Sequence, residues 1–185
     1  MSNENTIANP APLGLLGFGM TTVLLNLHNA GIIELSVVIA AMGFALGGSA
    51  QIVAGLMEFK KNNTFGATAF TAYGFFWWSL VFIWYNPLAV LNGADTVSMG
   101  YYLLLWGIFT MFMAIGTLKH NRATQVVFFS LTVLFFLLCI GDFTGAEIFT
   151  TVGGFVGIFC GGSAVYTSMA IILNNEFGKK VLPLG

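Results

Sequence analysis

Long apolar stretches alternate with short polar breaks along the chain. A helix that crosses a bilayer needs about 20 mostly apolar residues, and six runs of this order are present, at 13–27, 32–59, 65–85, 97–118, 123–140 and 148–173. Residues typical of helix ends occupy the breaks, at Pro10, Pro12, Asn29, Gly31, Pro87 and Gly141. The pattern predicts an all-α polytopic membrane protein with six transmembrane helices. The first run is the shortest, about 22 Å at 1.5 Å per residue, and we expect an unusually short first helix.

The breaks also predict an orientation and a domain layout. All six basic residues follow the second, fourth or sixth run, at Lys60, Lys61, Lys119, Arg122, Lys179 and Lys180. Because cytoplasmic loops carry the excess of Lys and Arg, both termini are expected in the cytoplasm. The layout is a cytoplasmic N-terminal segment, 1–12, a membrane domain, 13–174, and a cytoplasmic tail, 175–185. Residues 1–12 lack the pattern of a signal peptide, so no cleavage is expected.

The basic clusters indicate an internal repeat. Lys60, Lys119 and Lys179 are separated by 59 and then by 60 residues, and the sequence GGSA occurs both at 47–50 and at 161–164. Three helical hairpins follow from this spacing. Repeats arranged around an axis along the membrane normal commonly enclose a substrate path, although short loops between similar helices would give similar spacing without a true repeat.

Composition agrees with a membrane protein and excludes several functions. Hydrophobic residues make up 57% and charged residues 7% of the chain, whereas soluble domains carry about 25% charged residues. The net charge is −1, and without a basic stripe nucleic acid is not an expected partner. Membrane lipid is an expected partner. Cys139 and Cys160 lie inside apolar runs, where a thiol most often acts as a small core side chain.

The sequence offers no set of residues for catalysis. It contains no HExxH, GxSxG or CxxC pattern. The stretch GLLGFG, at 14–19, lacks the preceding strand and following acid of a dinucleotide site. His28 and His120 fall near opposite membrane surfaces, too far apart to share a metal. We therefore expect no enzyme, no cofactor and no metal.

Polar residues inside apolar runs are candidates for a solute path because they are costly in lipid. Thr22, Asn26 and Gln51 are the principal candidates. A single Ser or Thr often only bonds its own helix backbone, and for Gln51 a helix contact and a pore-facing role are equally compatible with the sequence. No Lys or Arg lies at mid-depth, so an anion site is expected to be weak. Glu58, beside Lys60 and Lys61, is expected in a surface ion pair.

Small residues gather on the second and sixth runs. Gly153, Gly157 and Gly161 form two successive GxxxG steps, and Gly43, Gly47 and Gly48 lie on the second run. Such residues let helices approach closely. The pattern leaves open whether they pack helices within one protomer or between protomers.

Several motifs together resemble the acetate uptake transporter family of succinate–acetate permeases. They are NPAPLGLLGFGMTTVLLNLHNAG at 9–31, FGATAFTAYGFFW at 65–77, GTLKHNR at 116–122, VFFSLTVLFF at 127–136 and NNEFGKKVLPLG at 174–185. NPAPLGL is the family signature, so Asn9, Pro10 and Gly14 are signature positions. The resemblance implies a six-helix protomer with a central pore, similar to urea channels, assembled as a homo-hexamer in the cell inner membrane.

The resemblance also implies functional residues. A hydrophobic constriction in the family corresponds to Phe18, Tyr73 and Leu131, one from each expected hairpin. Ala164 corresponds to a position linked to substrate size. We therefore expect a permease for acetate and other small carboxylates, including succinate as a candidate, that is passive or proton-coupled. The alternatives are a channel for a neutral solute, such as urea or undissociated acid, and a non-transporting membrane sensor or scaffold.

Overall fold

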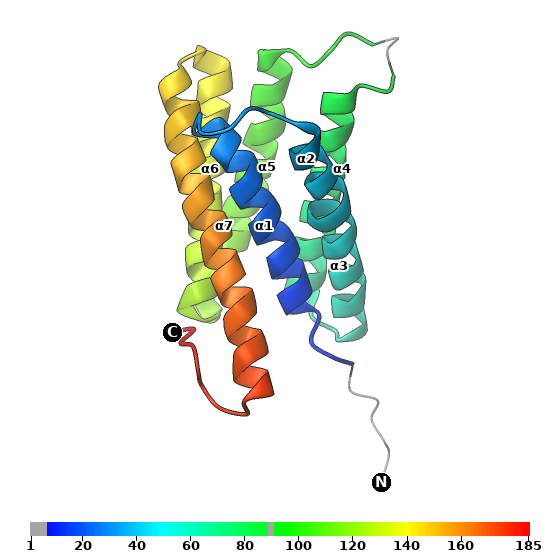
Figure 1. The fold of residues 1–185 in the computed structure, drawn as a ribbon, viewed down its shortest axis with the longest axis vertical. Coiled ribbons are helices and arrows are strands. Elements are labelled where there is room, and N and C mark those ends of the chain that lie inside the picture. Colours follow the sequence, from blue (N-terminus) through cyan, green and yellow to red (C-terminus); the bar gives the residue numbers. More distant parts are fainter. Residues whose placement is uncertain (1–6, 89–90) are drawn as a thin grey trace.

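Six helices long and apolar enough to cross a membrane form an upright bundle in the computed structural model, which describes residues 7–88 and 91–185 (Figure 1). This confirms the predicted fold class. The second span is continuous but has three parts, of which the middle one, η1, is π-helical. The elements are α1 (Ala11–Asn29), α2 (Val37–Met42), η1 (Gly43–Ala50), α3 (Gln51–Lys60), α4 (Thr64–Tyr85), α5 (Thr96–Gly116), the short 3₁₀ turn η2 (Thr117–Lys119), α6 (Arg122–Thr144) and α7 (Glu147–Glu176).

Polar side chains start three of the helices. Asn63, Asp95 and Asn121 each accept a hydrogen bond from the backbone N–H three residues later, at the first turns of α4, α5 and α6. These N-caps satisfy backbone donors that a helix leaves unpaired.

Two helices differ from the lengths expected from sequence. α6 continues through Gly141 and ends at Thr144, where Gly145 adopts φ +68°, so the predicted break at Gly141 is wrong. α1 has 19 residues, about 28 Å at 1.5 Å per residue, and is longer than the apolar run 13–27 because it also includes Ala11, Pro12, His28 and Asn29. It is nevertheless the shortest of the six spans among the described residues, as expected.

A backbone carbonyl group of the π-helical segment η1 accepts hydrogen bonds from two side chains. Its Phe44 carbonyl accepts hydrogen bonds from the Trp78 indole N–H at 3.1 Å and from the Ser49 hydroxyl at 2.9 Å. Such partners are needed in lipid, where no water can pair a free carbonyl. The first GGSA copy, 47–50, is thus π-helical and the second, 161–164, is α-helical, so the two copies differ in local structure.

The helices close into a ring in which neighbouring hairpins pack against each other. α1 packs most extensively on α7, α4 on α3, and α6 on both α5 and α7. Glycines of α7 produce the closest approach. A methyl group added at Gly161 would lie 2.6 Å from the Gly19 carbonyl oxygen of α1, and one at Gly157 would overlap the Asn26 amide. These GxxxG steps therefore join helices within one protomer.

One end of the bundle carries the basic residues, the start of α1 and the C-terminal tail, and we call it the basic end (Figure 1). The C-terminal tail folds back there. Its Leu184 carbonyl accepts from the Ala123 N–H at 2.8 Å, and its Leu182 carbonyl accepts from the Asn174 amide at 2.9 Å. The other end, which holds Asp142 and Glu147, is called the acidic end.

Candidate functional site

Two cavities lie inside the bundle, one toward each end. The acidic-end cavity has a volume of 190 Å³ and the basic-end cavity 130 Å³. A water molecule takes up about 30 Å³ in the liquid, so both cavities have room for a small solute. The residues common to both linings are Phe18, Tyr73 and Leu131. These three side chains therefore form the partition between the cavities.

The partition is apolar, and the aromatic ring of Tyr73 is held in place by a neighbouring helix. Phe18, Tyr73 and Leu131 are each at most 6% exposed. The Tyr73 hydroxyl donates to Thr110 on α5 at 2.9 Å, since the Thr110 hydroxyl itself donates to the Trp106 carbonyl at 2.7 Å. The Tyr73 phenol is thus engaged by α5. The partition consequently offers carbon surface to a solute.

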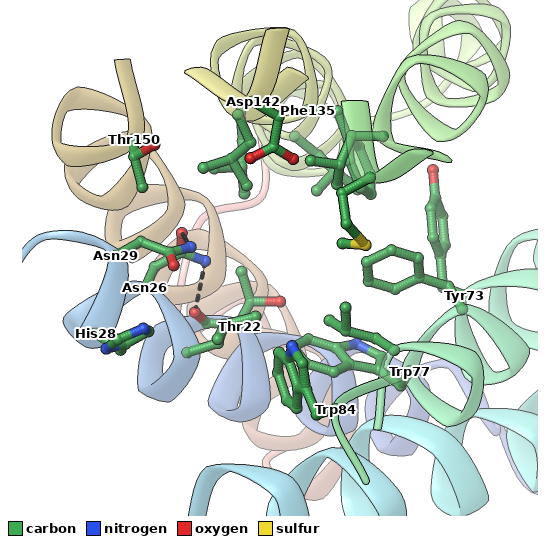
Figure 2. Close-up of a pocket in the computed structure, with 18 of the residues that line it drawn as sticks. Thr22, Asn26, His28, Asn29, Tyr73, Trp77, Trp84, Phe135, Asp142 and Thr150 are labelled. Carbon is green, nitrogen blue, oxygen red and sulfur yellow. Dashed lines mark hydrogen bonds between the residues drawn. The ribbon is translucent and has the colours of Figure 1, made fainter. Parts of the chain in front are cut away.

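The acidic-end cavity has polar groups on its walls (Figure 2). Asn26 donates to the Thr22 carbonyl at 2.9 Å and accepts from Asn29 at 3.0 Å, so its amide is held in place. The Thr22 hydroxyl is buried and has no hydrogen-bond partner among the described residues. Figure 2 shows the Asp142 carboxylate pointing into the space that Asn26 lines from α1. The polar lining residues are Thr22, Asn26, His28, Asn29, Asp142 and Thr150.

The basic-end cavity contains a buried amide with unused hydrogen-bonding capacity. Gln51 is fully buried, and neither its Nε2 nor its Oε1 has a partner in the described structure. An unpaired buried polar group costs about 1–3 kcal/mol. Gln51 lines this cavity together with Asn63 and His120, and so offers a donor and an acceptor to a solute there. The lining contains no Lys, Arg, Asp or Glu.

Two of the predicted path residues line neither cavity. Ala164 is fully buried in α7. Asn9 is exposed at the basic end, where its Oδ1 accepts from the Ala11 N–H at 3.2 Å and from Lys61 Nζ at 3.1 Å. Close packing explains the glycine at signature position 14. A methyl group at Gly14 would lie 2.5 Å from the ring of Phe70, which lines the basic-end cavity. Asn9 and Gly14 thus fix the start of α1.

The sequence pattern missed Asp142 and misplaced Glu58. Asp142 is not among the predicted path residues, because Gly141 predicts a helix end just before it, yet it lies in the last turn of α6. Glu58 is not at the surface: its side chain is fully buried, its Oε2 accepts from Asn63 at 2.8 Å, and Lys61 lies 3.9 Å away. The expected ion pair with a neighbouring lysine is therefore present, but its carboxylate is buried and not at the surface. No local sequence signal distinguishes the two cases.

Comparisons with known proteins agree with this arrangement. A model of the GPR1/FUN34/yaaH family matches residues 1–183. The chain is 56% identical to the succinate-acetate/proton symporter SatP of Escherichia coli K12, over 97% of this chain and 96% of that one. It is 33% identical to acetate permease A of Emericella nidulans, over 96% of this chain and 65% of that one. A solved structure of the bacterial acetate channel SatP superposes with a TM-score of 0.95 at 55% identity, covering 97% of this chain and 100% of that chain.

Proposed function

Because the chain belongs to the GPR1/FUN34/yaaH family, we propose that it is a membrane permease that carries acetate and other small carboxylates, including succinate, along the axis of each protomer. The observation that carries this proposal is the pair of cavities separated only by Phe18, Tyr73 and Leu131. The similarity to a succinate-acetate/proton symporter and to an acetate channel supports the choice of solute.

The chemistry of the path favours the undissociated acid at the partition. Moving a bare carboxylate across carbon surface is very costly, and the described residues that line the two cavities include no Lys or Arg to offset this cost. The Asp142 carboxylate at the acidic end also repels an anion, by about 1 kcal/mol at 4 Å in water and more in a drier site. A solute that crosses with its proton avoids both costs. Each solute molecule then carries its own proton, so the transport of solute and proton is coupled without a proton relay at mid-membrane.

Each cavity supplies weak polar contacts on either side of the partition. At the acidic end the Thr22 hydroxyl and the Asn26 amide face the solute, and at the basic end Gln51 offers both a donor and an acceptor. A neutral hydrogen bond contributes about 0.5–1.5 kcal/mol net. Such contacts allow a solute to bind and to leave quickly, as conduction requires.

Purified protein in liposomes tests the proposal. Labelled acetate is expected to enter faster than in protein-free liposomes, to be driven by an inward proton gradient, and to acidify the lumen. A current carried by acetate would show instead that the anion crosses alone. Absence of acetate entry above protein-free liposomes, with and without a pH gradient, would contradict the proposal and leave a non-transporting role.

We also propose that the basic end faces the cytoplasm in a cell inner membrane, with both chain ends on that side. The six basic residues support this orientation through the positive-inside rule. Cysteines placed at Gly93 and Asn175, both exposed, test it with a membrane-impermeant thiol reagent, because native Cys139 and Cys160 are buried. Labelling of Gly93→Cys in intact cells and of Asn175→Cys only after permeabilisation is expected. The reverse pattern would overturn the orientation.

Assembly as a homo-hexamer is likewise proposed, on the resemblance of the motifs. The described protomer presents large apolar side chains on its outer surface, among them Phe44, Phe112 and Phe155, each more than half exposed. Such a surface suits contact with lipid or with neighbouring protomers. Mass measurement in lipid nanodiscs is expected to give six copies, and a monomeric mass would contradict the assembly.

A further inference from the structure

Glu58 is a buried carboxyl group that the transport path does not otherwise use. Its side chain is fully buried near the end of α3, and its Oε1 has no hydrogen-bond partner in the described structure. A buried charge without full hydrogen bonding is strongly destabilising. Packing alone therefore does not explain why a carboxylate oxygen without a hydrogen-bond partner is present at this position.

Glu58 lies directly behind the wall of the basic-end cavity. Asn63, which donates to Glu58 Oε2 at 2.8 Å, lines that cavity, and so does Gly66. A methyl group added at Gly66 would be 3.1 Å from Glu58 Cγ and Cδ. Because Gly66 has no side chain, only its backbone separates this part of the Glu58 carboxyl group from the cavity.

Few charges surround this carboxyl group. The elements packed against α3 are α1, η1 and α4. In their sequences the titratable groups are His28 at the acidic end, Tyr73 in the partition and Tyr85 at the acidic end, and there is no Lys, Arg, Asp or Glu. The nearby charges are therefore Lys61, 3.9 Å away, and the adjacent Lys60. Lys61 also donates to Asn9 of the signature at 3.1 Å.

From this placement we infer that Glu58 is the proton acceptor of the basic-end cavity. The inference rests on the proposed function, in which the solute arrives from the partition as an undissociated acid. In the transfer, the O–H bond of the acid breaks and a new O–H bond forms at Glu58 Oε1, which leaves a carboxylate solute in the cavity. Glu58 then gives the proton to water at the basic end and recovers its negative charge beside Lys61. No electrons are exchanged.

Glu58→Gln tests the inference because it keeps the shape of the side chain but cannot accept a proton as a carboxylate does. Two initial rates are measured in proteoliposomes: exchange of labelled for unlabelled acetate without a gradient, and net acetate uptake driven by an inward proton gradient. Exchange needs no net proton release, so it is expected to persist. Net uptake is expected to fall roughly tenfold or more. The matched control is Glu176→Gln, an exposed acid at the same end, which is expected to change neither rate.

The outcomes separate the inference from the proposed function. Absence of exchange in the wild-type protein would overturn the proposed function itself. Wild-type exchange together with unchanged net uptake in Glu58→Gln would overturn the inference alone and leave water or His120, which lines the same cavity, as the acceptor.

A second variant keeps the inference falsifiable if Glu58→Gln fails to fold. Lys61→Met removes the cation that lies 3.9 Å from Glu58, beside which the carboxylate is restored after the proton leaves. The ratio of net uptake to exchange is expected to fall below that of the wild-type protein. An unchanged ratio would count against Glu58 as the acceptor.

Discussion

Gln51 combines a structural cost with a position in the path. Both of its polar side-chain atoms are buried without partners, so the side chain weakens the fold. We predict that Gln51→Leu leaves the free energy of unfolding unchanged or raises it, since a buried unsatisfied amide is removed. Acetate uptake is expected to fall roughly tenfold, the equivalent of about 1.4 kcal/mol. Thermal unfolding and proteoliposome uptake measure the two effects.

The matched control is Gln125→Leu. Gln125 lines neither cavity and donates to the His120 carbonyl at 3.0 Å, so uptake should remain at the wild-type level. A Gln51→Leu protein with full uptake would mean that the amide does not touch the solute.

The partition residues set the size of the solute. Phe18→Ala and Leu131→Ala each remove a side chain shared by the two cavities, and are predicted to raise the rate of lactate uptake relative to acetate. The ratio is expected to change by about tenfold or more, because a size difference of one methylene group in an apolar pocket is worth about 1–3 kcal/mol. Competition uptake with both labelled acids measures it. An unchanged ratio in both variants would remove these residues from the gate.

At the scale of the elements, the contact between α7 and α1 depends on glycine. A methyl group at Gly161 would lie 2.6 Å from a backbone oxygen of α1, whereas one at the adjacent Gly162 meets no atom within 4 Å. We predict that Gly161→Ala lowers the free energy of unfolding by about 1–3 kcal/mol and that Gly162→Ala leaves it nearly unchanged. Unfolding in mixed detergent micelles compares the pair. Equal stability of the two variants would show that α7 does not need this close approach.

The start of α5 should be sensitive to acid. Hydrogen bonds from the Ser98 hydroxyl and the Ser98 backbone N–H hold the pKa of Asp95 below its usual range. Because this pKa is lowered by folding, the stabilisation is present above the ordinary aspartate pKa and is lost as the pH falls through the folded value. The protection of the first-turn amides of α5, taken as their hydrogen-exchange rate relative to the intrinsic rate at each pH, is therefore expected to fall on acidification in the wild-type protein.

Asp95→Asn provides the control for this prediction. Asparagine also caps helices well but does not titrate, so the same amides should exchange at a rate with no such acid-dependent step. An acid-dependent step that persists in Asp95→Asn would place its origin at another group.

The sequence predicted the elements better than their details. Six apolar runs were sufficient for six spans because the backbone polar groups of a segment in lipid must be hydrogen-bonded within the segment, as they are in a helix. The helix ends were harder, because Gly141 resembles a helix end in the sequence but packs against Thr150 of α7 in three dimensions. The π-helical segment η1 was not predicted, and its Phe44 carbonyl is bonded by Trp78 of α4, which is distant in sequence.

For the whole molecule, the internal repeat connects the fold with the path. Each hairpin contributes one partition residue, Phe18 from α1, Tyr73 from α4 and Leu131 from α6. The family resemblance named these residues, and their meeting between the two cavities is visible only in three dimensions. The burial of Glu58 and the position of Asp142 also depend on tertiary packing. The lysines next to Glu58 are equally compatible with an exposed and a buried carboxylate, and the glycine before Asp142 is equally compatible with a helix end and a continuous helix.

The most direct test of the central account is to fill the partition. Leu131→Trp places a larger side chain between the cavities while leaving Gln51, Thr22 and Asn26 unchanged. Acetate flux is measured in proteoliposomes with wild-type protein, with Leu131→Trp and without protein, after gel filtration has shown that both proteins are folded. Acetate flux is expected to be well above the protein-free level for the wild type and close to that level for Leu131→Trp. Equal flux through the two proteins would contradict a path through the Phe18–Tyr73–Leu131 partition.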